Sequence, residues 1–485
     1  ITSNPFNYLF PIPKEGLGLN PILQDPALAI HPPILYLGYV GSSIIFSAAL
    51  AAVTQNYISK EWAQHIKKWV LVSWVFLSIG IMLGSIWAYY ELGWGGFWFW
   101  DPVENVSLMP WLTLTALFHC ILVLEKRLAL TSWVVILSIT TFTLSMCGTF
   151  LVRSGILNSV HTFANDPARG IFILTFLFIL IFLSLGIFFI FHKENNKDLS
   201  NFFWLSKETS ILINNWFMMY FLSVVLIGTV YPIFLDVVTA EKISVGPPFY
   251  HKLIAPFLGP FLLFMALGPK LKWIKSKVEK RNSLIIFFAV SVVLTIFVLK
   301  NLTTDLLFYT VLISAAFFLF FTTLNELFVK KLNNISQTIA HFGFSLMILS
   351  ILFNSILSSE IITNIKLGEK YNFNKIEIFF ERIEEKKESN FNSIIGHFKI
   401  TGENGKVVEL KPELRIYDQP TMITSEADIK TTLLEDKFLV MNLVKGGEYF
   451  NIRYQVKPFM LLIWFSVLLL SFGGLISIFK KRYEK

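Results

Sequence analysis

The sequence predicts an all-α polytopic membrane protein, with about eleven transmembrane helices in this chain and one small β-rich domain. The first observation is composition: 54% of the 485 residues are hydrophobic and only 15% are charged, which is too apolar for a soluble enzyme. The second is a series of apolar runs of about 18 to 25 residues, the length that a helix needs to cross roughly 30 Å of hydrocarbon. The third is a stretch near the C-terminus in which polar and apolar residues alternate, as in β-strands.

Four segments follow one another along the chain. Residues 1–33 contain repeated prolines, which fix φ and remove hydrogen-bond donors, so we expect an outer loop without a regular helix. Residues 34–357 are the expected transmembrane bundle, and residues 457–485 are a last transmembrane helix with a tail. Residues 358–456 are the expected β-rich domain, in which "ENG" at 403–405 predicts a hairpin turn. The expected spans lie near 34–53, 69–90, 107–124, 131–150, 170–191, 212–235, 251–269, 283–300, 303–329, 336–357 and 457–479.

Lysine and arginine gather in alternate short loops, and this pattern predicts the orientation. The basic loops are 54–68, 125–130, 192–211, 270–282 and 330–335, together with the tail. By the positive-inside rule these loops face the cytoplasm, so the N-terminal stretch and the β-rich domain lie outside. The net charge of +8 is therefore read as an insertion signal, and nothing in the sequence favours nucleic-acid binding.

Cysteine usage excludes thiol chemistry by this chain. Cys120 and Cys147 are its only cysteines, and both fall inside apolar runs. Neither a disulfide framework nor a CxxC redox pair is possible with that spacing. The sequence begins at Ile1 without an initiator methionine or a signal peptide, so we expect residues that precede it.

Two histidines fall inside apolar spans at comparable depth, toward the predicted cytoplasmic face. His119 and His341 are ionisable groups in the membrane, which makes them candidates for a functional site. Two imidazoles that face each other across a bundle are what a bis-histidine b-type haem requires. Gly343 and Ser345 are expected to let the porphyrin approach the backbone. The alternative is that each histidine only hydrogen-bonds to a neighbouring helix.

The stretch "WGGFWFWDPVEN" at 94–105 is the most unusual local pattern. Its rings can stack on a planar macrocycle, and the glycines within it allow close backbone approach. His31 and His161 flank it on the outer side and can close on an iron from opposite faces. The alternative is an ordinary interfacial aromatic belt. The rings expected to form one aromatic sheet are Trp94, Phe97, Trp98, Phe99 and Trp100, with Trp111 one turn into the next span.

Charged residues beside this stretch have two interpretations each. Arg153 can pair with a haem propionate or with a lipid phosphate. Asp101 and Glu104 are either a general acid/base pair or, more in keeping with their position, a cap where the helix resumes at Pro110. The four remaining histidines are read as non-ligands: His65, His192, His251 and His397.

The motifs together resemble one family. "WGGFWFWDPVEN" followed by "MPWL" is similar to the tryptophan-rich WWD signature of haem-handling proteins, placed here on residues 94–111. "LNPILQDPALAIHPPILYLGYVG", "GTFLVRSGILNSVHTF" and the C-terminal "VKPFMLLIWFSVLLLSFGG" resemble the CcmF family, the haem lyase component of bacterial cytochrome c maturation. The family has further helices upstream of the stretch that begins here.

The resemblance implies roles for individual residues. The outer haem ligands fall on His31 and His161, and the ligands of a membrane-embedded b haem fall on His119 and His341. The core of the WWD segment falls on Trp94–Asp101. The residues expected to act in the reaction are Trp94, Trp98, Trp100 and Asp101, and those expected to hold haem include Trp94, Phe97, Trp98, Trp100 and Arg153.

The reaction implied by the resemblance is covalent attachment of haem to apocytochrome c in the bacterial inner membrane, with the WWD segment and the β-rich domain facing the periplasm. Haem comes from the chaperone CcmE, and subunits of the CcmH and CcmI types assist. The b haem passes an electron from quinol to the substrate haem. Two alternatives stay open at this point: a haem-transfer module like CcmC, and a quinol-linked or ion-coupled membrane transporter.

Overall fold

The computed structural model describes residues 6–8, 10–14, 16, 18–154, 167–193, 203–239, 243–275, 281–300, 306–329, 334–402, 405–444 and 446–479. Contacts divide the chain into two compact units. Unit 1 comprises Ile1–Ile30, Ile86–Gly96 and Ser358–Lys457. Unit 2 comprises His31–Ser85, Phe97–Leu357 and Pro458–Lys485.

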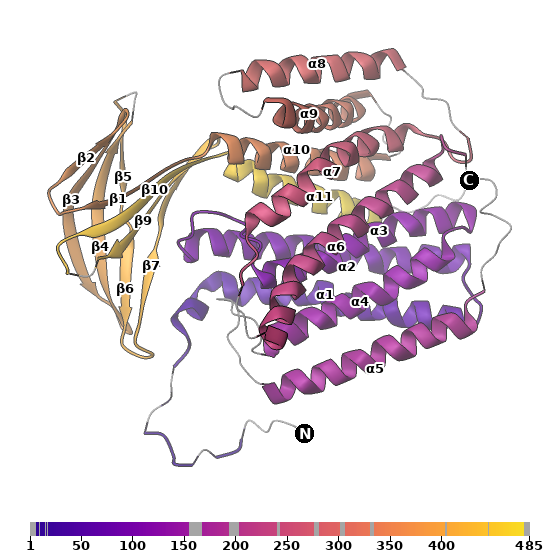
Figure 1. Ribbon diagram of the computed structural model, residues 1–485, viewed down its shortest axis with the longest axis horizontal. Helices are drawn as coiled ribbons and strands as arrows, with labels where there is room; N and C mark the ends of the chain where they lie inside the picture. Colours follow the sequence, from indigo (N-terminus) through magenta and orange to yellow (C-terminus); the bar gives the residue numbers. More distant parts are fainter. Residues whose placement is uncertain are drawn as a thin grey trace. The chain divides into compact units, whose positions relative to one another are not determined.

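The described part of the chain contains eleven helices that are long and apolar enough to cross a membrane, as predicted (Figure 1). Their number and their order follow the apolar runs, because a helix satisfies its own backbone hydrogen bonds in lipid. The first six are α1 (Pro26–Thr54), α2 (Lys60–Glu91), α3 (Pro102–Arg127), α4 (Thr131–Arg153), α5 (Pro167–Phe191) and α6 (Lys207–Thr239). The others are α7 (Pro247–Leu267), α8 (Arg281–Leu299), α9 (Leu306–Val329), α10 (Ile335–Leu357) and α11 (Met460–Phe479).

The first helix begins earlier than its prolines suggested. The prediction of a loop to residue 33 is wrong, because α1 starts at Pro26 and contains Pro32 and Pro33. A proline in the first turn removes a donor that has no partner in any helix. The two later prolines remove interior hydrogen bonds, and close packing of α1 on α2 offsets that loss. A Cβ placed on Gly80 of α2 would lie 2.7 Å from the Cα of Leu35 on α1.

Helices α10 and α11 approach each other through glycines from both sides. A Cβ on Gly343 of α10 would lie 2.6 Å from the backbone nitrogen of Leu470 and 2.8 Å from the carbonyl oxygen of Ser466. A Cβ on Gly473 of α11 would lie 2.6 Å from the backbone nitrogen of Ala340. Small residues let backbones approach in this way where helices associate in lipid.

Helix α3 lies at the centre of the bundle core. It supplies many of the fully buried apolar side chains of the main cluster, among them Leu114, Leu117 and Ile121. Its end carries Glu125, which accepts a hydrogen bond from Lys67 of α2 at 2.7 Å. Two similar ion pairs join other helix ends, Arg127 with Glu208 and Lys270 with Glu326.

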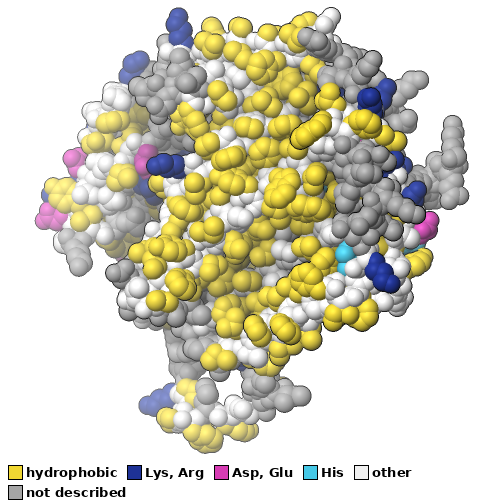
Figure 2. Space-filling model, turned by 45° about the vertical axis from the view of Figure 1, so that its right-hand side comes forward, with side chains coloured by type: hydrophobic (Ala, Val, Ile, Leu, Met, Phe, Trp, Pro, Cys, Tyr) yellow, Lys and Arg dark blue, Asp and Glu magenta, His cyan; other side chains and the backbone are white. Residues whose placement is uncertain are grey.

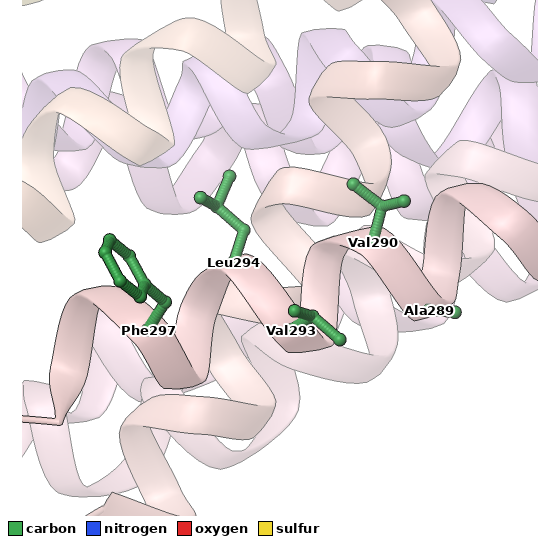
Figure 3. Close-up of a pocket in the computed structure, with 5 residues that line it drawn as sticks. All are labelled: Ala289, Val290, Val293, Leu294 and Phe297. Atoms are coloured by element: carbon green, nitrogen blue, oxygen red, sulfur yellow. The ribbon is translucent and has the colours of Figure 1, made fainter.

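The outer surface of the bundle is apolar. Hydrophobic side chains cover most of the face shown in Figure 2, and Lys and Arg side chains lie toward its edges. A recess on α8 is lined only by apolar side chains (Figure 3), namely Ala289, Val290, Val293, Leu294 and Phe297. A surface of this composition suits contact with lipid chains, so the recess is no candidate for chemistry.

Unit 1 contains the predicted β-rich domain, which is a sandwich of two antiparallel sheets. Side chains from both sheets share one core, in which Phe380 stacks on Phe398 with ring centroids 4.3 Å apart. The first sheet has the order β1-β10-β9-β8, and the second has the order β2-β3-β4-β6-β7 with β5 paired to β4. The bounds are β1 (Ser359–Ile365), β2 (Lys370–Phe373), β3 (Ile376–Lys387), β4 (Phe391–Thr401), β5 (Val407–Leu410), β6 (Glu413–Tyr417), β7 (Met422–Glu426), β8 (Asp428–Thr431), β9 (Glu435–Leu443) and β10 (Phe450–Pro458).

The predicted hairpin joins β4 to β5, which pair antiparallel with Thr401 opposite Val407. Residues 403–404 of its turn lie outside the described part of the chain, and Gly405 has a positive φ of 67°. Unit 1 also contains residues 86–96, the end of α2 and the start of the aromatic stretch.

Candidate functional site

The aromatic segment, defined here as Trp94–Asp101, ends in a tight helix cap. Asp101 is the N-cap of α3, and its Oδ1 accepts a hydrogen bond of 2.9 Å from the nitrogen of Val103. Glu104 completes a capping box, since its Oε2 accepts from the nitrogens of Asp101 at 3.1 Å and Phe99 at 2.8 Å. The capping interpretation is therefore confirmed. The expected resumption of the helix at Pro110 is wrong, because α3 begins at Pro102 and this geometry satisfies its first donors.

Trp100 is held by contacts with three residues outside the segment. Its backbone has a positive φ of 59°, which turns the chain into the cap. The indole stacks on Tyr250 with centroids 4.3 Å apart and planes 7° apart, and its Nε1 donates to Nε2 of His251 at 3.3 Å. The amide nitrogen of Asn105, a fully buried residue, lies 3.1 Å from the carbonyl oxygen of Trp100 and 2.9 Å from the hydroxyl of Tyr250. One face of Trp100 is thus covered by protein.

The rings do not form the single aromatic sheet that the sequence suggested. Trp98 and Trp100 meet edge to face at 89°, and Phe97 meets Trp464 of α11 at 87°. Trp111 is turned into the bundle, where it stacks on Trp74 and donates from Nε1 to the hydroxyl of Ser78 at 2.8 Å. The buried hydroxyl on α2 gives the indole N–H of Trp111 a partner there, so this ring does not join the sheet.

His31 lies in α1, and it faces α2. Its Nδ1 is 2.8 Å from the carbonyl oxygen of Gly80. A carbonyl only accepts, so this nitrogen carries the proton and Nε2 keeps the lone pair that could bind a metal. A Cβ on Gly84 would lie 2.6 Å from the ring, so the imidazole rests on the backbone of α2. Its predicted partner His161 lies outside the described residues. Arg153 is exposed at the end of α4.

His119 of α3 and His341 of α10 are close enough to influence each other. Their imidazoles interact electrostatically across α3 and α10. Nδ1 of His119 is 2.8 Å from the carbonyl oxygen of Thr115, which again leaves Nε2 as the lone-pair nitrogen. Two imidazoles from different helices that interact with each other, one of them with its tautomer fixed, fit the donor set of a b-type haem. The described residues contain no cluster of three or more His, Cys, Asp or Glu side chains that would hold a bare metal ion.

The residues expected to admit a porphyrin beside His341 have other roles. The backbone of α11 occupies the space beside the Cα of Gly343. The glycine therefore lets a helix approach and leaves no room there for a ligand. The hydroxyl of Ser345 donates to the carbonyl oxygen of Phe342 at 2.8 Å and lies 3.3 Å from the hydroxyl of Thr323. Both residues therefore hold α10 against its neighbours and fix where His341 stands.

Known proteins match this chain along its whole length. Residues 1–157 match the family model described as cytochrome C assembly protein, and residues 356–458 match the CcmF C-terminal beta-sandwich. The chain is 39% identical over 499 residues to the cytochrome c-type biogenesis protein CcmF of Pseudomonas fluorescens, which covers 100% of this chain and 75% of that protein. It belongs to the CcmF family.

A second family member and a solved structure also match the chain. CcmF of Escherichia coli (strain K12) is 36% identical over 494 residues, covering 100% of this chain and 76% of that protein. A solved structure named Cytochrome c Heme Lyase CcmF has the same fold, with a TM-score of 0.75, 24% identity and coverage of 93% of this chain and 72% of that one. Membership of the CcmF family supports the first of the three functional hypotheses over the CcmC-like module and the transporter.

Sequence reasoning missed the residues that hold Trp100 in this CcmF-family chain. Tyr250 and His251 lie at the start of α7, about 150 positions from the aromatic segment, and the sequence assigned no role to the tyrosine. The only local signal was a histidine where a span begins, in "GPPFYHKL". Asn105 was quoted within the motif, yet a lone buried amide predicts no particular partner.

Charged groups near His341 were also unassigned. Glu326, Lys270 and Lys207 all interact electrostatically with its imidazole. Nζ of Lys270 donates to Oε1 of Glu326 at 2.6 Å, and the carboxylate is buried. The sequence pattern assigns both lysines to the topology signal alone.

Proposed function

We propose that this chain is a haem lyase that attaches haem covalently to apocytochrome c at the periplasmic face of the bacterial inner membrane. Each thiol of the client's CxxCH motif adds across one vinyl group of haem. A sulfur–carbon bond forms at the carbon next to the porphyrin, and hydrogen passes to the terminal carbon, so the addition itself is neither an oxidation nor a reduction. Both reacting thiols belong to the client in this proposal, because Cys120 and Cys147 lie within the apolar helices α3 and α4.

The observation that carries the proposal is the fixed aromatic segment at the start of α3. Trp100 is held by stacking, by two hydrogen bonds and by the capped helix that follows it. Rigid rings can seat a flat substrate without losing much conformational freedom. Bringing vinyl groups and thiols to near-attack distance converts a bimolecular encounter into an intramolecular one, which is where most of the acceleration would arise.

The histidines take two roles in this proposal. His31 and His161 are the axial ligands of the substrate haem, and Trp94, Phe97 and Trp98 line it with Trp100. His119 and His341 would hold a b-type haem, which supplies one-electron chemistry with quinol as the electron source. Arg153 is proposed to pair with a propionate. Asp101 is assigned to positioning, because its carboxylate is already engaged in the cap.

The proposed partners follow from the same reaction. Haem is delivered by a periplasmic chaperone of the CcmE type, and apocytochrome c is presented with subunits of the CcmH and CcmI types. The sandwich in unit 1 lies on the periplasmic side in this orientation, with the basic loops in the cytoplasm.

An optical spectrum of the purified protein, measured beside a cytochrome c maturation assay in cells, tests the proposal. His119→Ala and His341→Ala should each remove a six-coordinate low-spin b signal that His31→Ala retains. Trp98→Ala and Trp100→Ala should abolish maturation and keep the b signal. Trp204→Ala, at a side chain that is 91% exposed, is the matched control and should change neither. Normal maturation in both tryptophan variants would refute the proposed role of the aromatic segment.

A further inference from the structure

The β-sandwich contacts the end of α2 at Tyr89 and the first two residues of the aromatic segment, Trp94 and Gly95. The hydroxyl of Tyr89 donates to Asp436 of β9 at 3.2 Å. The carbonyl oxygen of Trp94 accepts from Nη1 of Arg453 on β10 at 3.0 Å. Gly95 follows, and a Cβ there would lie only 2.0 Å from Oε1 of Gln455. All of these contacts lie inside unit 1, which contains both the sandwich and residues 94–96, where the aromatic segment begins.

One carboxylate, that of Glu360, holds the side chains of Arg453 and Gln455. Nε of Arg453 and Nε2 of Gln455 both donate to Oε1 of Glu360 on β1, the latter at 2.6 Å. Burial alone would raise the pKa of Glu360, but these two hydrogen bonds bring that pKa below its ordinary value, so the carboxylate is charged at neutral pH. One anion thus fixes the rotamers of both side chains that touch the aromatic segment.

The side chain of Gln455 packs directly against the backbone of Gly95. Its side chain is buried with 3% of its surface exposed, and among the described residues its Oε1 has no hydrogen-bond partner. That atom lies where any side chain on residue 95 would project. Gly95 also has a positive φ of 69°, so both its conformation and its surroundings require glycine.

We propose that Glu360, Arg453 and Gln455 form a clamp that positions the aromatic segment for haem attachment, and that this is the role of the β-sandwich. This inference rests on the proposed function. Trp94 and Gly95 are joined to Phe97 and Trp98 by a short run of backbone, so a displacement at the clamp is passed along the chain to the rings. The three residues are positioning residues, and none of them needs to touch haem.

Arg453→Ala tests the hydrogen bond to Trp94. Maturation of cytochrome c should fall about 10- to 100-fold, the loss expected when reacting groups are displaced by about 1 Å. Haem supplied by its chaperone should show a shifted Soret band and midpoint potential, while the b signal of His119 and His341 stays unchanged. Arg453→Lys keeps a charged donor and should recover part of the activity. Arg382→Ala, which breaks an exposed ion pair of the same sandwich with Glu384, is the matched control and should change nothing.

Gly95→Ala tests the close approach independently. Gly405 has nearly the same φ, 67°, and nothing within 4 Å of its Cβ position. Gly405→Ala therefore introduces the same backbone strain without the clash, and it should mature cytochrome c normally. Combining Gly95→Ala with Gln455→Ala removes the clashing amide. The loss due to Gly95→Ala should then become at least about fivefold smaller than in the presence of Gln455, as expected for residues in direct contact.

The outcomes separate the clamp from the proposed function. Wild-type maturation and an unshifted haem spectrum in Arg453→Ala would overturn the clamp and leave the lyase proposal standing. An equal loss from Gly95→Ala with and without Gln455 would do the same. Failure of the unaltered full chain, assayed with its membrane partners, to take haem from the chaperone would overturn both. A normal b signal in each variant shows that the bundle has folded.

Discussion

Gly343→Ala should weaken the binding of a b haem although the residue touches no ligand. The added methyl group would stand 2.6 Å from the backbone nitrogen of Leu470, about 0.8 Å short of the 3.4 Å at which ordinary contact begins. A backbone atom cannot rotate away as a flexible side chain can. Helix α10 must therefore shift or turn against α11, and His341 lies only two positions before the glycine.

The magnitude follows from the cost of overpacking. Extra methylene groups in a packed interior typically cost about 1 to 3 kcal/mol. Because about 1.4 kcal/mol corresponds to a factor of ten in an equilibrium constant, haem affinity should fall roughly 5- to 150-fold if the strain must be overcome to align His341 with His119.

Haem titration of the purified apoprotein, followed by the low-spin signal, measures this loss directly. The matched control is Gly259→Ala in α7, another buried helical glycine, whose Cβ would make an ordinary contact of 3.8 Å with Val311. It should bind haem as the unaltered protein does. Equal affinities in Gly343→Ala and Gly259→Ala would refute the argument that α11 fixes the position of His341.

Three other predictions concern the cap, the thiols and the sandwich. Asp101→Asn should keep the N-cap and near-normal maturation, whereas Asp101→Ala should destabilise α3 by about 0.5 to 2 kcal/mol and reduce maturation; loss of maturation in Asp101→Asn would show that the charge itself is needed. Combined replacement of Cys120 and Cys147 by serine should leave maturation normal in the same assay, because the client supplies both thiols. Burial raises the pKa of Asp436, although hydrogen bonds, including one from Tyr89, lower it in part. The pKa of this carboxyl is therefore higher in the folded than in the unfolded protein. Its contribution to stability is largest below the unfolded pKa and is lost as pH rises through the folded pKa. Asp436→Asn should remove that fall and raise the unfolding temperature of the sandwich at neutral pH, and a pH profile as steep as the wild type's would contradict this.

The helices were predictable because a membrane span needs little more than a long apolar run. The sandwich was predictable as β structure from its alternation of polar and apolar residues. Helix starts were less predictable: Pro32 and Pro33 argue against a helix locally, yet both lie inside α1, which packs against α2 and α4. A packing partner that lies elsewhere in the sequence overrides such local signals.

Within the candidate site, residue types were predictable and their partners were not. His119 and His341 were paired by their depth in two spans, which sequence patterns do report. Trp111 was assigned to the aromatic sheet because helical spacing gave no sign of Ser78 on the facing helix. The contact of Trp94 with Arg453 joins residues 359 positions apart, and no periodicity in either segment could have indicated it.

Helix α3 fixes the distance between the Asp101 cap and His119. It starts at the Asp101 cap and contains His119 eighteen residues later, so the cap and the imidazole are separated by about 27 Å of continuous helix. Inserting one residue would rotate everything beyond it by about 100° and advance it by about 1.5 Å, turning the histidine away from α10. The length of this interval is therefore as constrained as the identity of the residues at its ends.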